Sequence, residues 1–354
     1  MSRFLSEKYS ALEPYTPGEQ PKAAGLIKLN TNENPFPPSP KVMEAIGSAE
    51  VNKLNLYPDP EAGELIKAAS RYYGIPENMI MAGNGSDEIL AFSFMAFQKN
   101  GRIVFPDISY GFYEVYAEVY GAKASKIPLD DNLAIKIEDY YNAEAMVVLA
   151  NPNAQTGTAI DLEDIEKALK TNENSLVLVD EAYVNFGAES GLQLIGKYDN
   201  LLVIQTFSKA RNLAGGRIGL AFADAEIIKD LNKIKYSFNP YNVNRLSIIA
   251  AVASLNDNEY FEGCVGEIQD TRKIFTGHME RLGFHVLPSL ANFVLARHDK
   301  ISGEEFYRAL REKNILVRHF NDRRIVDYVR ITIGRREDMA ALVKAAEEIL
   351  ARRG

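Results

Sequence analysis

The chain has 354 residues, of which 46% are hydrophobic and 25% charged, and its formal net charge is −8. The length predicts one large domain with a smaller one beside it, and the composition is typical of a globular protein. The negative charge argues against nucleic acid or an anionic membrane as a partner. The single cysteine, Cys264, excludes an intrachain disulfide and fits the reducing cytoplasm.

Neither a targeting segment nor a metal site is expected. The first ten residues, "MSRFLSEKYS", lack the apolar centre of a signal peptide, and the longest apolar stretches reach only about half of a membrane span. The four histidines are scattered and show no ligand spacing. The sequence therefore predicts a cytoplasmic protein without a bound metal.

The predicted elements follow one pattern up to residue 242 and another after it. Residues 1–40 are rich in Pro, Asn and Gly and are expected to form an extended arm. Over 41–242, helices alternate with short apolar strands, which is typical of βαβ units around a mainly parallel sheet. Residues 243–354 combine helices with strand-like segments and indicate a smaller α+β domain. The expected strands are 78–83, 102–105, 145–150, 175–180, 201–207, 217–222, 285–288, 292–297, 315–320 and 328–334, and the expected helices are 61–74, 86–98, 111–121, 162–170, 243–256, 258–282 and one from about 335.

Opposite charges follow two successive strands, where ligands of open α/β sheets bind. Asp180 comes directly after the apolar "LVLV", and Lys209 follows the next strand 29 residues later. A carboxylate in this position is costly unless a cation or several donors meet it. Three interpretations stay open: Asp180 caps a turn, the two residues form an ion pair, or they bracket a ligand.

Pyridoxal phosphate (PLP) is a ligand of this kind. Its aldehyde forms a Schiff base with a lysine, its ring nitrogen needs an acid partner, and its phosphate needs an anion site. "GNGSDE" at 83–88 joins a strand to a helix, so free N–H groups can meet a phosphate there, although Ser86 could be only an N-cap. The segment lacks the endings of a dinucleotide fingerprint and of a Walker loop. Ser208 and Arg217 are further candidates for the phosphate.

Six segments of the chain are "LNTNENPFPPSP", "LYPDP", "GNGSDE", "NPNAQTG", "VDEAY" and "TFSKARNLAGGRIGL". In their order and spacing the chain resembles the fold-type I PLP-dependent aminotransferases over nearly its whole length. "LEPYTPGEQP" near the start and "ILVRHF…YVRITIG" near the end narrow the resemblance to the histidinol-phosphate aminotransferase family. The resemblance implies an α/β fold with a PLP-binding domain at 41–242, built on a mainly parallel seven-stranded sheet. It also implies a small domain at 243–354, and an arm at 1–40 that packs against the small domain and a dimer partner.

The resemblance assigns roles to five residues around the cofactor. Lys209 would hold the aldehyde and shuttle a proton, and Asp180 would keep the ring nitrogen protonated. Tyr183 would bind the phenolic oxygen of the ring, Tyr110 would stack on the ring, and Tyr57 would reach the phosphate across the dimer interface. The alternatives without a functional role are that Tyr183 and Tyr110 are core aromatic residues and that Tyr57 belongs to a simple turn. The expected cofactor-binding set is Tyr57, Gly85, Ser86, Asp87, Tyr110, Asn153, Asp180, Tyr183, Ser208, Lys209 and Arg217.

"NPNAQTG" departs from the family pattern N-P-N-N-P-T-G. The asparagine that contacts the phenolic oxygen in the family is replaced by Ala154, so either Asn153 shifts to serve or Tyr183 carries the contact alone. Gln155 stands where proline is usual, which predicts a looser turn.

Four residues are expected at the substrate. Arg318 and Arg330 lie on strand-like segments, and the planar guanidinium suits carboxylate or phosphate; the alternative is ion pairing with acidic neighbours in the same region. Tyr15 would reach over the substrate into the partner's site, unless the arm is disordered, and Asn32 would lie near the entrance.

The implied reaction is amino transfer between L-histidinol phosphate and 2-oxoglutarate, giving imidazole-acetol phosphate and L-glutamate, within histidine biosynthesis and in a homodimer with shared active sites. The alternatives are an aromatic amino acid aminotransferase and a PLP-dependent decarboxylase of a phosphorylated amino acid. A non-catalytic relative would be expected to lose the lysine or the acid, and a nicotinamide-dependent dehydrogenase is disfavoured by the incomplete glycine fingerprint.

Overall fold

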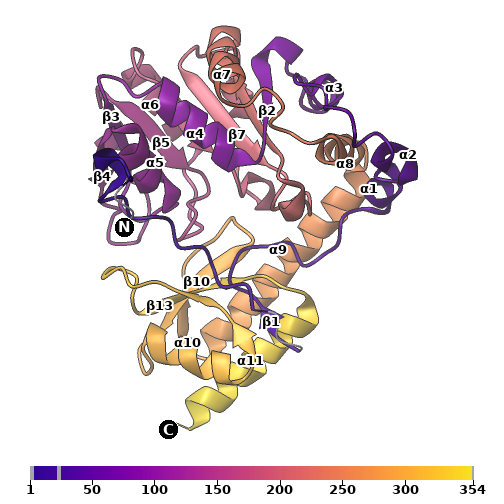
Figure 1. Ribbon diagram of the computed structural model, residues 1–354. Coiled ribbons are helices and arrows are strands. Elements are labelled where there is room, and N and C mark those ends of the chain that lie inside the picture. The colour runs from indigo at the N-terminus through magenta and orange to yellow at the C-terminus, as the bar shows by residue number, and fades with distance from the viewer. Residues whose placement is uncertain (1–3, 22–24, 353–354) are drawn as a thin grey trace.

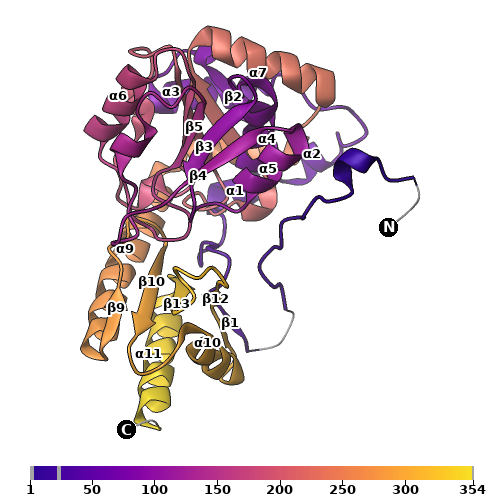
Figure 2. The same cartoon turned by 90° about the vertical axis from the view of Figure 1, so that its left-hand side faces the viewer.

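The computed structural model describes residues 4–21 and 25–352. They form a large domain and a small domain, and the long helix α9 (Asn258–Arg281) leads from one to the other (Figure 1). The N-terminal arm begins beside the large domain, reaches the small domain and then returns to the large domain (Figure 2). In the described part of the chain, no helix has both the length and the apolarity that a bilayer span requires.

The large domain is built on seven strands in the order β2-β8-β7-β6-β5-β3-β4. Only β8 is antiparallel to its neighbours, so the predicted mainly parallel seven-stranded sheet is confirmed. The strands are β2 (Ile80–Gly83), β3 (Arg102–Pro106), β4 (Lys123–Ile127), β5 (Met146–Ala150), β6 (Val177–Asp180), β7 (Leu201–Thr206) and β8 (Gly219–Ala223).

Helices cover both faces of this sheet, as its apolar strands require. Along β6, Val177 and Val179 join the core under α3, α6 and α8, whereas Leu178 joins the core under α4, α5 and α7. The helices are α1 (Pro40–Ala45), α2 (Ser48–Val51), α3 (Gly63–Tyr73), α4 (Ser86–Ala96), α5 (Phe112–Tyr120), α6 (Leu162–Thr171), α7 (Ala225–Phe238) and α8 (Arg245–Leu255). Short 3-10 helices are η1 (Glu7–Tyr9), η2 (Glu77–Met79), η3 (Ile137–Tyr140), η4 (Val184–Phe186), η5 (Gly191–Leu194) and η6 (Ala214–Gly216).

The packing boundary between the domains lies after α8. Ile248 and Ala251 on this helix are buried in the core of the large sheet, whereas Phe261 on α9 belongs to the core of the small domain. α8 therefore packs with the large domain, where α1 and α3 lie against it.

The small domain holds a four-stranded antiparallel sheet in the order β12-β13-β10-β9. The arm is attached to this domain, since β1 (Ile27–Lys28) pairs in parallel with β11 (Ile315–Leu316). The other elements are β9 (Phe284–Val286), β10 (Phe293–His298), α10 (Gly303–Glu312), β12 (Arg318–His319), β13 (Tyr328–Thr332) and α11 (Arg336–Ala351).

Candidate active site

A cavity lies at the carboxyl ends of β5, β6 and β7, in the place that the topology predicts for a ligand. The loops that line it come from segments far apart in the sequence, which the parallel sheet brings to one edge. The predicted site residues that line the cavity are Ser86, Asp87, Tyr110, Asp180, Tyr183, Ser208, Lys209 and Arg217.

Asp180 is the last residue of β6 and its carboxyl group is buried. Burial raises its pKa from 3.8 to about 6, and this is opposed by a hydrogen bond from the Tyr113 hydroxyl and another from the Ala182 amide. These bonds measure 2.7 Å and 3.2 Å. Among the described residues no cation forms a salt bridge with Asp180. The carboxylate therefore lacks the positive partner that a protonated ring nitrogen supplies.

Lys209 follows β7 and faces the same cavity without pairing with Asp180. Its Nζ donates to the Thr31 carbonyl at 3.1 Å and lies 5.8 Å from the centre of the Tyr183 ring. An amine that is held by a carbonyl and not by a carboxylate is available to a ligand. The structure therefore has no ion pair between Asp180 and Lys209.

The N-terminus of α4 and Arg217 form a site suited to an anion. Gly85 has φ +82°, and a Cβ there would lie 2.5 Å from Nη2 of Arg217, so only glycine lets the guanidinium approach. Arg217 forms a salt bridge with Asp87 at 2.9 Å and donates to the Ser208 hydroxyl at 3.4 Å. The free N–H groups of the helix and the guanidinium converge as a phosphate requires.

Two tyrosines flank the cavity. The Tyr110 hydroxyl donates to Asp87 at 2.7 Å, and burial raises the pKa of this phenol far above its ordinary value. The Tyr183 hydroxyl accepts from Nδ2 of Asn32 at 3.0 Å, and its ring packs edge-on against Phe293.

Asn32, which is predicted to lie near the substrate entrance, is buried. It has φ +56°, and its side chain joins Tyr183 to Thr332, whose hydroxyl donates to Oδ1 of Asn32 at 3.0 Å. This asparagine therefore links the arm to both domains and orients the Tyr183 hydroxyl.

Asn153 is not among the residues that line the cavity. Its Nδ2 donates to the Ile108 carbonyl at 2.9 Å, while Oδ1 accepts from the amides of Gln155 and Thr156. Its capacity for hydrogen bonds is used within the loops, so of the two options for the phenolic oxygen, Tyr183 is the one that the geometry supports.

Tyr57 also lies away from the cavity of its own chain. Tyr57 is 76% exposed as a residue, and its ring stacks on that of Tyr241 with ring centres 4.4 Å apart. This exposed placement fits the predicted role across an interface.

The two predicted substrate arginines lie beside the arm, and neither has a carboxylate partner among the described residues. Arg330 donates to the carbonyls of Ala154 at 2.8 Å and Asn30 at 3.4 Å, and burial lowers its pKa. Arg318 donates to the carbonyl of Thr16 at 3.5 Å. The alternative of ion pairs with nearby aspartates is not seen, and both charges remain available to an anion.

Tyr15 packs beside Tyr110 and stacks on Phe112 of its own chain, with ring centres 6.0 Å and 4.3 Å away. Burial raises the pKa of its phenol, and the charges of Arg330 and Arg318 oppose the rise. The arm therefore brings this side chain close to the arginines, whichever site it serves in a dimer.

Sequence reasoning missed Tyr113, Asn34 and Ala182. Tyr113 binds Asp180, Asn34 donates to the carbonyl of Lys209 at 3.0 Å, and Ala182 lines the cavity. Only Asn34 had a signal, as one of the polar residues in "LNTNENP"; nothing in "SYGFYEVY" distinguishes the tyrosine that reaches the acid.

The sheet, the cavity at its carboxyl edge, and the lysine, acid and anion site within it define an enzyme of fold type I. The family described as aminotransferase class I and II matches residues 24–345. A histidinol-phosphate aminotransferase of Brachyspira hyodysenteriae is 47% identical over 352 residues, and one of Clostridium botulinum is 46% identical over 351; each alignment covers 99% of both chains.

Solved structures agree. The histidinol-phosphate aminotransferase from Clostridium acetobutylicum has a TM-score of 0.86 at 28% identity and covers 92% of this chain and 100% of its own. That from Sinorhizobium meliloti, in complex with pyridoxal-5'-phosphate, has a TM-score of 0.84 at 25% identity and covers 93% and 92%. The chain therefore belongs to the class I and II aminotransferases, in the branch of the histidinol-phosphate aminotransferases.

Proposed function

We propose that this chain is a PLP-dependent aminotransferase that interconverts L-histidinol phosphate and 2-oxoglutarate with imidazole-acetol phosphate and L-glutamate, in histidine biosynthesis. Relatives named histidinol-phosphate aminotransferase match the chain over 99% of its length at 46–47% identity. The geometric observation that carries the assignment is that Lys209 and Asp180 line one cavity without pairing with each other.

The residues present fit the cofactor. When bound, PLP supplies an electrophilic carbonyl for the amino group and a ring that accepts the electron pair of the bond broken at the substrate carbon. Asp180 would hold the proton on the ring nitrogen, because a buried carboxylate without a cation gains most from such a donor.

Lys209 would act through its Nζ, first as the attachment point and then as the base that takes up a proton and returns it. The Thr31 carbonyl orients this nitrogen, and the hydrogen bond from Asn34 fixes the lysine backbone. Tyr183, held by Asn32, would donate its hydroxyl proton to the phenolic oxygen.

The phosphate of the cofactor would lie at the start of α4, against Ser86, Ser208 and Arg217. Asp87 orients Arg217 through their salt bridge and also accepts from Tyr110. Tyr110 is thereby fixed for contact with the ring.

Arg330 and Arg318 would bind the anionic ends of the substrates. Their guanidinium groups suit phosphate and carboxylate alike, which an enzyme with two different anionic substrates requires. Tyr15, between the arginines and Tyr110, would close the site over the bound substrate.

A homodimer with shared active sites is part of the proposal. Exposed apolar side chains gather near α1, α2 and the end of α7, where Tyr57 stacks on Tyr241. A second copy would cover this surface and receive Tyr57 in its phosphate site. The residues of this surface are Met43, Val51, Leu54, Leu56, Tyr57, Phe238 and Tyr241. The cytoplasm is the proposed location, because the one cysteine is an unpaired thiol.

Competing amino donors test the substrate. We expect higher kcat/KM with L-histidinol phosphate than with L-phenylalanine, at equal 2-oxoglutarate, since Arg330 and Arg318 present charge for an additional anion. Faster turnover of phenylalanine would instead support the aromatic aminotransferase.

A further inference from the structure

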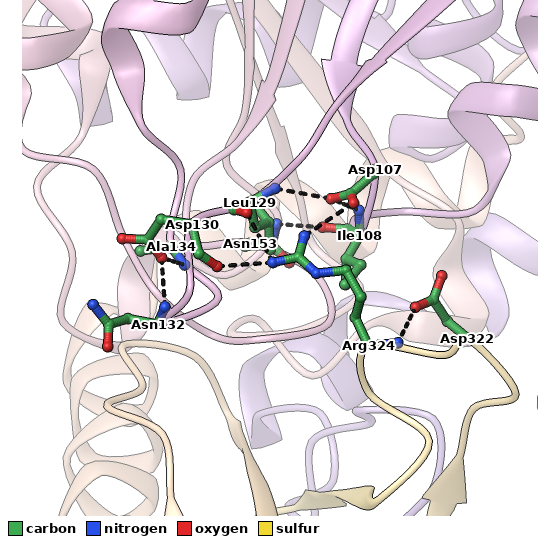
Figure 3. A network of polar contacts seen from close by, with 9 residues as sticks. All are labelled: Asp107, Ile108, Leu129, Asp130, Asn132, Ala134, Asn153, Asp322 and Arg324. Carbon is green, nitrogen blue, oxygen red and sulfur yellow. Dashed lines mark hydrogen bonds and ion pairs between the residues drawn. The ribbon is translucent and has the colours of Figure 1, made fainter.

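Arg318 and Arg330 face each other across a hairpin whose tip touches the other domain. The two residues are register partners in the antiparallel pair β12–β13. The connecting loop, residues 320–327, extends from the small domain to loops of the large domain (Figure 3). The tip of this loop therefore lies at the ends of the two strands that carry both arginines.

One guanidinium holds the tip. Nη1 of Arg324 donates to Oδ2 of Asp107 at 3.0 Å, and Nη2 donates to the carbonyls of Leu129 and Asp130, both at 2.8 Å (Figure 3). The second oxygen of Asp107 accepts from the amides of Ile108 and Leu129 at 2.9 Å and 3.0 Å. The carboxylate of Asp107 is therefore oriented by hydrogen bonds within the large domain, independently of Arg324.

Apolar packing reinforces this contact. Ile325, next to Arg324, is completely buried. Its cluster combines large-domain and small-domain side chains: Ile108, Leu129, Leu133 and Leu295. An exposed ion pair alone contributes little to stability. Here the guanidinium of Arg324 binds three acceptors, and the buried side chain of Ile325 packs beside it.

The contact continues to the cofactor cavity. Asn153 donates to the Ile108 carbonyl at 2.9 Å, and Nε2 of Gln155 donates to the Ser109 carbonyl at 2.6 Å. Arg330 in turn donates to the Ala154 carbonyl at 2.8 Å. The loop that differs from the family pattern at 154 and 155 is thus tied both to the loop that Arg324 grips and to a substrate arginine.

We propose that Arg324 is a positioning residue, a clasp that holds the hairpin tip on the large domain and so keeps the register pair Arg318 and Arg330 in place for the substrate. The clasp sets affinity for the anionic substrate and leaves proton transfer at Lys209 and cofactor binding unchanged. This role rests on the proposed function for the two arginines, whereas the domain contact itself does not.

The test compares R324Q with wild type as PLP-loaded enzyme. We expect KM for L-histidinol phosphate to rise about tenfold, equal to 1.4 kcal/mol, with kcat changed less than about twofold. The dissociation constant of PLP should stay the same. Hydrogen exchange of the amides of Ile108, Leu129 and Ala134 should become faster, because the loops lose their tether.

Two variants serve as controls. R308Q removes an exposed arginine that pairs only within α10, and it should match wild type in KM and in exchange. R324K keeps the charge but cannot reach all three acceptors, so its KM should lie between those of wild type and R324Q.

An unchanged KM in R324Q, or a rise shared equally by R308Q, would overturn the proposal. So would a parallel loss of PLP binding, which would indicate general damage to the fold. If wild type does not turn over histidinol phosphate, the proposed function fails, and the exchange data alone decide on the clasp: faster exchange supports it and unchanged exchange refutes it.

Discussion

Asp180, at the end of β6, is a buried carboxyl group that suits a ligand but lowers the stability of the cofactor-free protein when it is ionised. The pKa of Asp180 is raised to about 6 by burial, and no salt bridge of the described residues compensates for it. In the unfolded chain the carboxyl group is an ordinary one, so the folded state holds its proton more tightly. Its contribution to stability is full below about pH 3.8 and is lost as the pH rises through about 6.

Replacement by asparagine should therefore stabilise the cofactor-free protein in a pH-dependent way. For Asp180→Asn we expect little gain near pH 4 and a gain of up to about 3 kcal/mol at pH 7, less the cost of a lost hydrogen bond. Urea denaturation of both apo-proteins across this range measures the difference. A gain that does not grow with pH would contradict the account. The same variant should lose transaminase activity by about 100-fold or more, because the ring nitrogen loses its acid partner.

Tyr113 should be visible in the pH profile. Its hydroxyl stabilises the charged form of Asp180, so Tyr113→Phe raises the pKa of that carboxyl further. The acidic limb of kcat/KM should then move to higher pH, with the plateau at neutral pH little changed. A profile that falls uniformly at every pH would indicate a role in packing alone.

At the scale of elements, an apolar sequence pattern predicts the strands that are buried on both faces of the sheet, but it fails for strands at the edge of the sheet. β5, β6 and β7 were found from the sequence because every residue in them is buried. β4, with the sequence "KASKI", was missed, since an edge strand with half-exposed side chains has no apolar run. The pairing of β1 with β11 was likewise invisible, because two residues carry no periodicity.

The site was predictable where it follows from topology. Lys209, Asp180 and Arg217 meet because parallel strands end at one edge. The orientation of Asn153, the left-handed Asn32 and the grip of Arg324 depend on contacts between segments 45 to 300 residues apart, which no local spacing encodes.

Gly219 on β8 packs so closely against the start of α4 that a larger residue should disturb the phosphate site. A Cβ at Gly219 would lie 2.6 Å from the backbone of Gly85 and Ser86, so Gly219→Ala must move the phosphate site. We expect a loss of about 1–3 kcal/mol in stability and weaker PLP binding, measured by denaturation and by fluorescence titration. Gly215→Ala is the matched control, since nothing lies within 4 Å of its added Cβ. Equal behaviour of the two variants would refute this view of the cradle.

At the scale of the molecule, the proposed homodimer would bury the exposed apolar surface near α1 and α2. Leu54 is 54% exposed as a residue, and Leu54→Glu should place a charge within the proposed interface. We expect light scattering to give a dimer for wild type and a shift towards monomer for the variant, with activity lost in parallel because Tyr57 no longer reaches its partner. Ile274→Glu, at an exposed apolar position on α9, should leave both properties unchanged. A wild-type monomer with full activity would exclude shared sites.

The most direct measurement concerns the lysine. The enzyme loaded with PLP is reduced with borohydride, digested, and its peptides are weighed by mass spectrometry. We expect a pyridoxyl group on Lys209 alone, since its side chain lines the cavity that Asp180 and Arg217 also line. A label on another lysine, or none, would contradict the assignment of the site.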